Sequence, residues 1–163
     1  MSDPAAPLSL WEWTLGRYRR EGVAPLCLLL QELYDADVNV LFLALWLAAN
    51  GRALGPDDNP AAEVEAWHKS VVLPLRSARR AMKGWPMPEE GPTAEDRDAI
   101  RAKVQAAEIG TERLELGLLT SWAARVELRP ADAGLDTALA NLQQVLPKAS
   151  GEPHIGKLAE LTA

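Results

Sequence analysis

The longest apolar stretch of the chain runs from Val23 to Asn50 and is broken once, by the polar elbow Tyr34-Asp35-Ala36-Asp37. In its second half, from Val38 to Ala49, every residue except Asn39 is apolar, so a helix formed there keeps no face for water. This half is shorter than the roughly 20 residues that a helix needs to cross a bilayer. We therefore predict a helical hairpin that neighbouring helices bury and that does not span a membrane.

A first helix is predicted before the hairpin. Ser9 and Glu12 form a capping box that starts it at Leu10, and Gly22 is expected to end it. Helical spacing places Trp13 on a separate side from the predicted core residues of this helix, which are Trp11, Leu15 and Tyr18. The arginines near its end are expected to be solvated and to complement the helix dipole: Arg17, Arg19 and Arg20.

A helix is also predicted after the hairpin, over residues 61–83. Asn59 can cap it and Pro60 suits its first turn, where a missing N–H costs little. Pro74 removes one backbone hydrogen bond further along, so we predict one bent helix rather than two separate ones.

The segment 85–93 contains three prolines and a glycine and is predicted to be an internal loop. Thr93 and Asp96 then open a long helix that Pro130 ends, and a last helix covers about residues 131–146. Its apolar stripe between Ile100 and Val126 is nearly heptad-like, so this helix packs either along the bundle or onto a second protomer.

These patterns predict an all-α, single-domain bundle of about six helices around the central hairpin, residues 23–50. Strands are not expected, because β-branched residues rarely alternate with polar ones. The two ends, residues 1–8 and 148–163, are expected to be flexible. In the second of them, the fragment LAEL forms a short helix only if it docks on the bundle.

The composition narrows the functions to be considered. A formal net charge of -6 disfavours general affinity for nucleic acid. The single cysteine, Cys27, lies within LCLLL, which excludes an intramolecular disulfide and indicates an inert core thiol. The first residues, MSDPAAPLS, lack the basic and apolar regions of a secretory signal, so we expect a cytoplasmic protein.

A cluster of four cations in PLRSARRAMK is the sharpest candidate site. They stand at i, i+3, i+4 and i+7, which places them on one helical face: Arg76, Arg79, Arg80 and Lys83. Because arginine binds carboxylate and phosphate with paired hydrogen bonds, this face can bind an acidic protein partner or an anionic ligand. The alternative is a face paired with Glu63, Glu65 or the acids of other helices. A nucleic-acid partner is not expected, since no groove-reading motif accompanies the cluster.

Trp85 stands beside this basic face, at the start of the proline-rich loop. Most of the six tryptophans fit helical stripes and are expected in the core. Trp85 is the exception, and it either anchors a partner or fastens its own loop to the bundle.

A second candidate site is a pocket near the elbow that uses Glu32, Asp35 and His68, as in a small-molecule-binding or enzymatic bundle. The elbow acids could hold a cation, but helix capping and turn formation explain them equally well. Glu65 and His68 form the E-x-x-H pair of di-iron bundles, yet a second copy is missing. We therefore expect no metal and no cofactor. No nucleotide-binding, nucleophile-elbow or zinc-protease motif is present, so no catalytic residue is assigned.

Three segments in this order carry a family resemblance: WEWTLGRYRREGV, CLLLQELYDADVNVLFLALWLA and VVLPLRSARRAMK. They resemble a proteobacterial family of small conserved hypothetical proteins, catalogued as a domain of unknown function, over about residues 10–119. The run Pro-Leu-Arg-x-x-Arg-Arg matches that family from Pro74 to Arg80, whereas Leu30-Gln31-Glu32 stands where the family has Leu-Gln-Asp. The resemblance implies a bacterial, cytosolic, helical protein and supplies no activity or site residue.

We therefore expect a noncatalytic helical interaction or regulatory protein that binds an acidic partner or an anionic ligand through its basic face. The alternative is a small-molecule-binding or enzymatic bundle with its pocket near residues 32–37.

Overall fold

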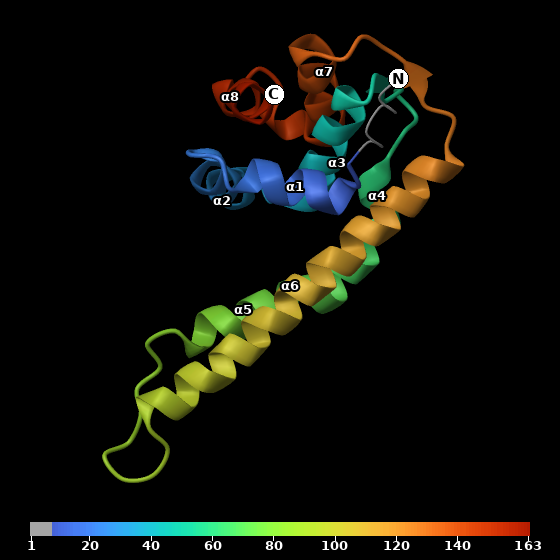
Figure 1. The fold of residues 1–163 in the computed structure, drawn as a ribbon. Coiled ribbons are helices and arrows are strands. Elements are labelled where there is room, and N and C mark those ends of the chain that lie inside the picture. Colours follow the sequence, from blue (N-terminus) through green and yellow to red (C-terminus); the bar gives the residue numbers. More distant parts are fainter. Residues whose placement is uncertain (1–7) are drawn as a thin grey trace, which may run out of the picture. The chain divides into compact units, whose positions relative to one another are not determined.

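The computed structural model describes residues 8–163, and there the chain is helical apart from one short pair of strands (Figure 1). The all-α prediction is confirmed. The expected flexible end at residues 1–8 lies, except for Leu8, outside the described residues. Two compact units are formed, one by residues up to 63 together with 116–163 and one by residues 64–115. None of the helices within residues 8–163 combines the length and apolar character of a membrane span.

The first unit is built around α3 (Val38–Ala49), which is buried from Val40 to Ala48 except for the half-buried Trp46. This helix has no polar face, and its neighbours cover it as the hydrophobic pattern predicts. The surrounding helices are α1 (Leu10–Tyr18), α2 (Val23–Tyr34), α7 (Leu135–Val145) and α8 (Pro153–Thr162) (Figure 1). Both hairpin helices have the predicted bounds, although α2 leaves Leu28 and Leu33 exposed. The hairpin is therefore buried mainly through α3.

The residues after α3 form a strand that the sequence did not indicate. β1 (Arg52–Ala53) pairs with β2 (Arg129–Pro130) in an antiparallel ladder, with Ala53 opposite Arg129. At two residues each, these strands are too short to show alternation in the sequence. The long helix α6 (Ala94–Arg125) accordingly ends before β2 and not at Pro130.

Asn141 of α7 is a buried amide that joins three parts of the first unit. Its side-chain oxygen accepts a hydrogen bond from the N–H of Leu54 (2.8 Å). Its side-chain nitrogen donates to the carbonyls of Ala44 and Arg52, each at 3.0 Å. The amide thus satisfies the backbone where the chain leaves α3 and enters β1.

Helix α1 ends at Tyr18, earlier than predicted. The capping box of Ser9 and Glu12 starts it as expected. Gly22, with a φ of 83°, is the N-cap of α2 and does not end α1. A left-handed residue cannot continue a right-handed helix, so the two helices are separate.

The face of α1 that packs inward is not the predicted one. Trp13 is buried and meets the ring of Phe42 edge-to-face, with the ring centroids 6.2 Å apart. Tyr18 is exposed, while Trp11 and Leu15 are half-buried. Both sets of residues have helical spacing. Tyr18 also contacts the Phe42 ring, with the centroids 6.1 Å apart, but only Trp13 is buried by this packing.

The C-terminal tail forms α8, with Ile155, Leu158 and Ala159 buried, so the docking that its LAEL fragment requires is present.

Arg17 and Arg20 bind the C-terminal end of α8. Arg17 donates from Nε to the carbonyl of Thr162 (3.1 Å), and Arg20 donates from Nη1 to the carbonyls of Leu161 (3.1 Å) and Ala163 (2.5 Å). These arginines therefore complement the dipole of α8, and Arg17 also stands in the last turn of its own helix, as expected.

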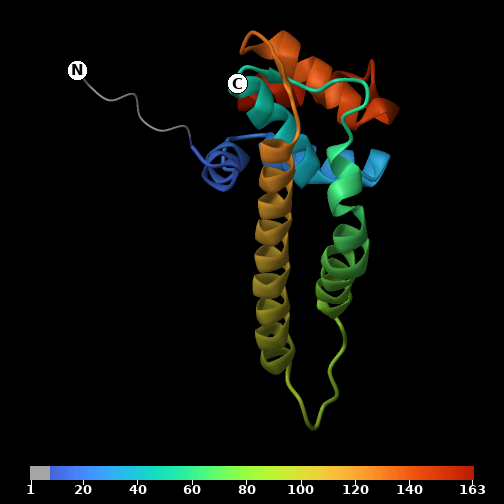
Figure 2. The same ribbon diagram turned by 90° about the vertical axis from the view of Figure 1, so that its right-hand side faces the viewer.

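The second unit is a pair of antiparallel helical arms joined by the loop at residues 83–93 (Figures 1 and 2). The first arm continues from α4 (Pro60–Trp67) through a π-helical turn, η1 (His68–Val72), into α5 (Leu73–Met82). The second arm is the N-terminal part of α6. Thr93 and Asp96 cap α6 reciprocally, as predicted.

The π turn shows how Pro74 is accommodated. The N–H of Leu73 donates to the carbonyl of His68, five residues earlier. One extra residue is thereby admitted just before the proline, where the regular bonding pattern would be interrupted. The predicted bent helix is a continuous helical arm with this turn inside it.

We predict that Asn141→Ala lowers the free energy of unfolding by about 2–3 kcal/mol, because three backbone groups, two of them in buried hydrogen bonds, lose their partner. Urea unfolding followed by circular dichroism measures this change. Gln143→Ala, a matched amide on the same helix, is the control and should cost much less. Equal losses for the two variants would contradict the role assigned to Asn141.

Candidate functional site

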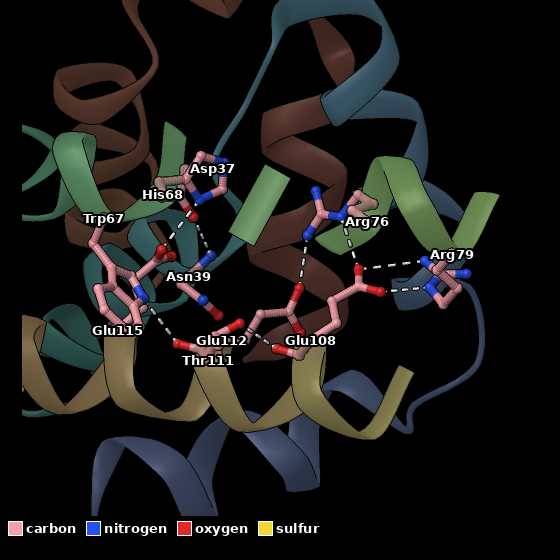
Figure 3. Close-up of polar contacts among 10 residues, drawn as sticks. All are labelled: Asp37, Asn39, Trp67, His68, Arg76, Arg79, Glu108, Thr111, Glu112 and Glu115. Atoms are coloured by element: carbon pink, nitrogen blue, oxygen red, sulfur yellow. Dashed lines mark hydrogen bonds and ion pairs between the residues drawn. The ribbon is translucent and has the colours of Figure 1, made fainter. Parts of the chain in front are cut away.

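Two of the four clustered cations point onto α6 (Figure 3). Arg76 donates from Nε to Glu108 (3.0 Å) and from Nη2 to Glu112 (2.6 Å). Arg79 donates to the same Glu108 from Nε and from Nη2 (3.3 Å). Glu108 is buried and both arginines are half-buried, so these three side chains are paired inside the second unit. Glu65 and Glu63 instead pair with Lys69 and Arg125.

The two carboxylates of this cluster respond differently to their surroundings. Burial raises the pKa of Glu108, but the hydrogen bonds from Arg79 and Arg76 outweigh it, and the pKa falls below its ordinary value of 4.5. Burial also raises the pKa of Glu112, and the hydrogen bond and charge of Arg76 do not offset it. Glu108 is therefore the carboxylate that the two arginines stabilise in its charged form.

Further polar contacts continue along the arms toward α4. Nδ1 of His68 lies 3.1 Å from Oε2 of Glu115, whose side chain is fully buried. The indole N–H of Trp67 donates to the carbonyl of Thr111 (3.1 Å) (Figure 3). No residue of α5 is buried completely. Polar and charged contacts thus contribute much of what joins the two arms.

The other two cations and Trp85 are exposed at the loop end of the arms. Arg80 and Lys83 face solvent, and the residue Trp85 is 59% exposed. Arg97 donates to the carbonyl of Trp85 (2.7 Å) and pairs with Asp98 (2.8 Å). The loop is therefore fastened through its backbone, while the indole ring is left in solvent.

The elbow residues serve helix ends. Asp35 adopts a left-handed conformation (φ 55°) as the C-cap of α2, and Asp37 accepts a hydrogen bond from the N–H of Asn39 (3.0 Å) to cap α3. Glu32 and Asp35 are exposed in the first unit, whereas His68 belongs to the second. Of this candidate pocket, the structure places only His68 against a buried acid.

Cys27 is buried, as expected for a core thiol. Burial raises its pKa to about 12, so very little thiolate is present at neutral pH.

The carboxylates of α6 are the site residues that the sequence analysis missed. Glu108, Glu112 and Glu115 stand four and three residues apart, which places them on one helical face. Their order matches that of the other arm, because Glu115 meets His68 while Glu112 and Glu108 meet Arg76. The sequence did contain a signal for this pairing: the cations of one predicted helix and the carboxylates of the next recur at the same spacing of three and four residues.

A comparison with known protein families shows to which family the chain belongs. The sequence model of the family described as Protein of unknown function (DUF2390) matches residues 9–119, and the chain belongs to this family. The match contains all of the second unit and ends within α6. No curated protein and no solved structure matches the chain.

We predict that Glu108→Gln lowers the free energy of unfolding at pH 7 by about 3 kcal/mol, because it leaves two half-buried arginines without their shared charge. The lowered pKa of Glu108 means that this contribution is present above pH 4.5 and is lost as the pH falls below it. The difference between wild type and variant should therefore narrow in acid.

Urea unfolding followed by circular dichroism between pH 7 and pH 3 measures both effects. Glu89→Gln, in the exposed loop, is the control. A difference that stays constant over this range would show that the charge of Glu108 is not what stabilises the arms.

Proposed function

We propose that this member of the DUF2390 family is a noncatalytic interaction protein that docks an acidic protein through the loop end of its helical arms. Trp85 is the anchor, and Arg80 and Lys83 supply the charge. The exposure of Trp85 carries the proposal. An indole left in solvent on a fastened loop offers a large apolar contact at little conformational cost.

The contacts within the second unit narrow the binding surface. Arg76 and Arg79 already hold carboxylates, so their role is structural. Their paired donors are not free for a phosphate, which favours a protein partner over a small anionic ligand. Arg80 and Lys83 are the members of the basic cluster that remain for a partner.

The charge of this surface is local. Glu89 and Glu90 lie exposed on the same loop, so the cationic part is confined to the α5 side around Arg80 and Lys83. A partner that suits it presents an apolar pocket for Trp85 with an acidic rim on one side. Exposed charge pairs of this kind steer association and weaken with salt. A bacterial cytoplasmic location is part of the proposal. The family resemblance implies the bacterial source, and the free buried Cys27 is compatible with a reducing compartment.

The test is affinity capture from the host lysate, followed by affinity measurement with the captured protein. We expect Trp85→Ala to weaken binding by about 30-fold, the effect of a typical interface hot spot of about 2 kcal/mol. The double variant Arg80→Glu/Lys83→Glu should weaken it as well, most strongly at low salt, because the new like charges repel each other and salt screens this repulsion.

The matched control is Arg19→Glu/Lys148→Glu, which makes the same charge change at exposed positions elsewhere. Circular dichroism verifies that each variant is folded. If capture survives both Trp85→Ala and the Arg80/Lys83 reversal, the loop end is not the docking surface.

Self-association along α6 is a second proposal, and a separate observation favours it. Ile100 and Leu114 are about half exposed, although the apolar stripe between residues 100 and 126 would be expected to turn inward. A second copy that covers them would remove this apolar surface from water. We expect light scattering to give the mass of a dimer for the wild type and of a monomer for Ile100→Glu/Leu114→Glu. A monomeric wild type at high concentration would rule this out.

A further inference from the structure

The first unit contains a cavity of about 220 Å³ among α1, α3, α7 and α8. Small side chains of three helices line this space, among them Ala48 of α3, Ala138 of α7 and Ala159 of α8. The exposed residues Ala49 and Leu135 border this space, so it is open to solvent on one side and a small molecule can enter it.

The wall of the cavity is mostly apolar. Trp13 and Leu45 line it together with the three alanines, and the half-exposed Leu135 also borders it. An apolar cavity of about 150 Å³ is known to accept benzene. The present one is larger, so a single ring or a short alkyl chain with a few further atoms fits its volume.

Arg17 is the one charged side chain among the residues that line the cavity. Its guanidinium carbon lies 4.8 Å from the centroid of the Trp13 ring, and Nε donates to the carbonyl of Thr162 (3.1 Å). Both contacts fix the position of the group. Within residues 8–163, no acceptor is paired with its two terminal nitrogens, which leaves their N–H donors for a ligand.

The surroundings of the Arg17 guanidinium favour an anion beside it, while the oxygen of Ala163, which also lines the cavity, is bound by Arg20. Burial lowers the pKa of Arg17, and the positive charge of Arg20 lowers it further. Both effects disfavour the charged guanidinium, and a bound anion would offset both. A carboxylate suits the remaining donors and is less strongly hydrated than a phosphate dianion, so it matches a cavity whose wall is otherwise apolar.

We propose that this cavity binds a small carboxylic acid with a compact apolar body, either aromatic or a short alkyl chain. The carboxylate meets Arg17, and the body lies against Trp13, Leu45 and the three alanines. This site is separate from the loop end of the arms, so it does not depend on the proposed docking function.

Isothermal titration calorimetry with phenylacetate and hexanoate tests the proposal on the full chain. Phenylacetamide, which has the same ring without the charge, is the matched ligand. We expect saturable binding of both acids. Phenylacetamide should bind at least about tenfold more weakly than phenylacetate, because it loses a charge-assisted hydrogen bond. An absence of saturable binding of either acid at millimolar concentration overturns the proposal.

Two variants locate the site. Arg17→Gln keeps a side-chain amide but removes the charge, and it should weaken phenylacetate binding about tenfold while leaving phenylacetamide unchanged. Ala49→Leu, at an exposed position that borders the cavity, should abolish binding of both by filling the space. Arg19→Gln, an exposed arginine on the next residue but one, is the control and should bind as wild type does.

Thermal melts establish that each variant is folded. If Arg17→Gln is unfolded, Ala49→Leu decides alone. Phenylacetate binding that persists unchanged in folded Ala49→Leu would place the ligand elsewhere and overturn the assignment.

Discussion

The carboxylate of Glu108, held by two arginines of the opposite arm, is the contact on which the second unit depends. The arms bury few large apolar side chains against each other, and α5 buries none completely. A buried charge without its partner costs several kcal/mol, so a shift of one arm along the other would be penalised at every paired position. Charge matching therefore does here what interlocking apolar residues do in an ordinary helical hairpin. Arg80 and Lys83, the other two cations of the basic cluster, stay exposed.

The first unit uses the opposite principle. Helix α3 offers water no face, so its position is fixed by the helices that cover it. Such packing fixes the chain only where apolar side chains are in contact. The backbone that leaves α3 needs hydrogen-bond partners as well. Asn141 supplies them by bonding to three backbone groups at once. Where small residues of three helices meet instead of large ones, the same packing leaves the cavity beside Arg17.

The sequence predicted those features that depend on neighbouring residues. The capping boxes at Ser9 and Thr93 mark true helix starts, and the bounds of the hairpin helices follow from hydrophobic pattern and turn chemistry. Contacts between distant residues were not predictable in this way. Trp13 is buried against the ring of Phe42, which lies 29 positions further along the chain, and the sequence near Trp13 does not reveal this contact. The helical state of the tail depends on docking, and Arg17 reaches a helix end across most of the chain. Pairing of the basic cluster was one of two open alternatives, and only the arrangement of α6 decides it for Arg76 and Arg79.

The π turn at residues 68–72 determines which arginines turn inward. Each residue added to a helix rotates all later side chains by about 100° around the axis. If the same sequence formed a regular α-helical turn here, Leu75 and Ala78 would occupy the positions toward α6 that Arg76 and Arg79 now hold. The wider turn thus sets the division between cations used within the fold and cations left on its surface. A single backbone irregularity, five residues long, fixes the electrostatic character of everything that follows it in the arm.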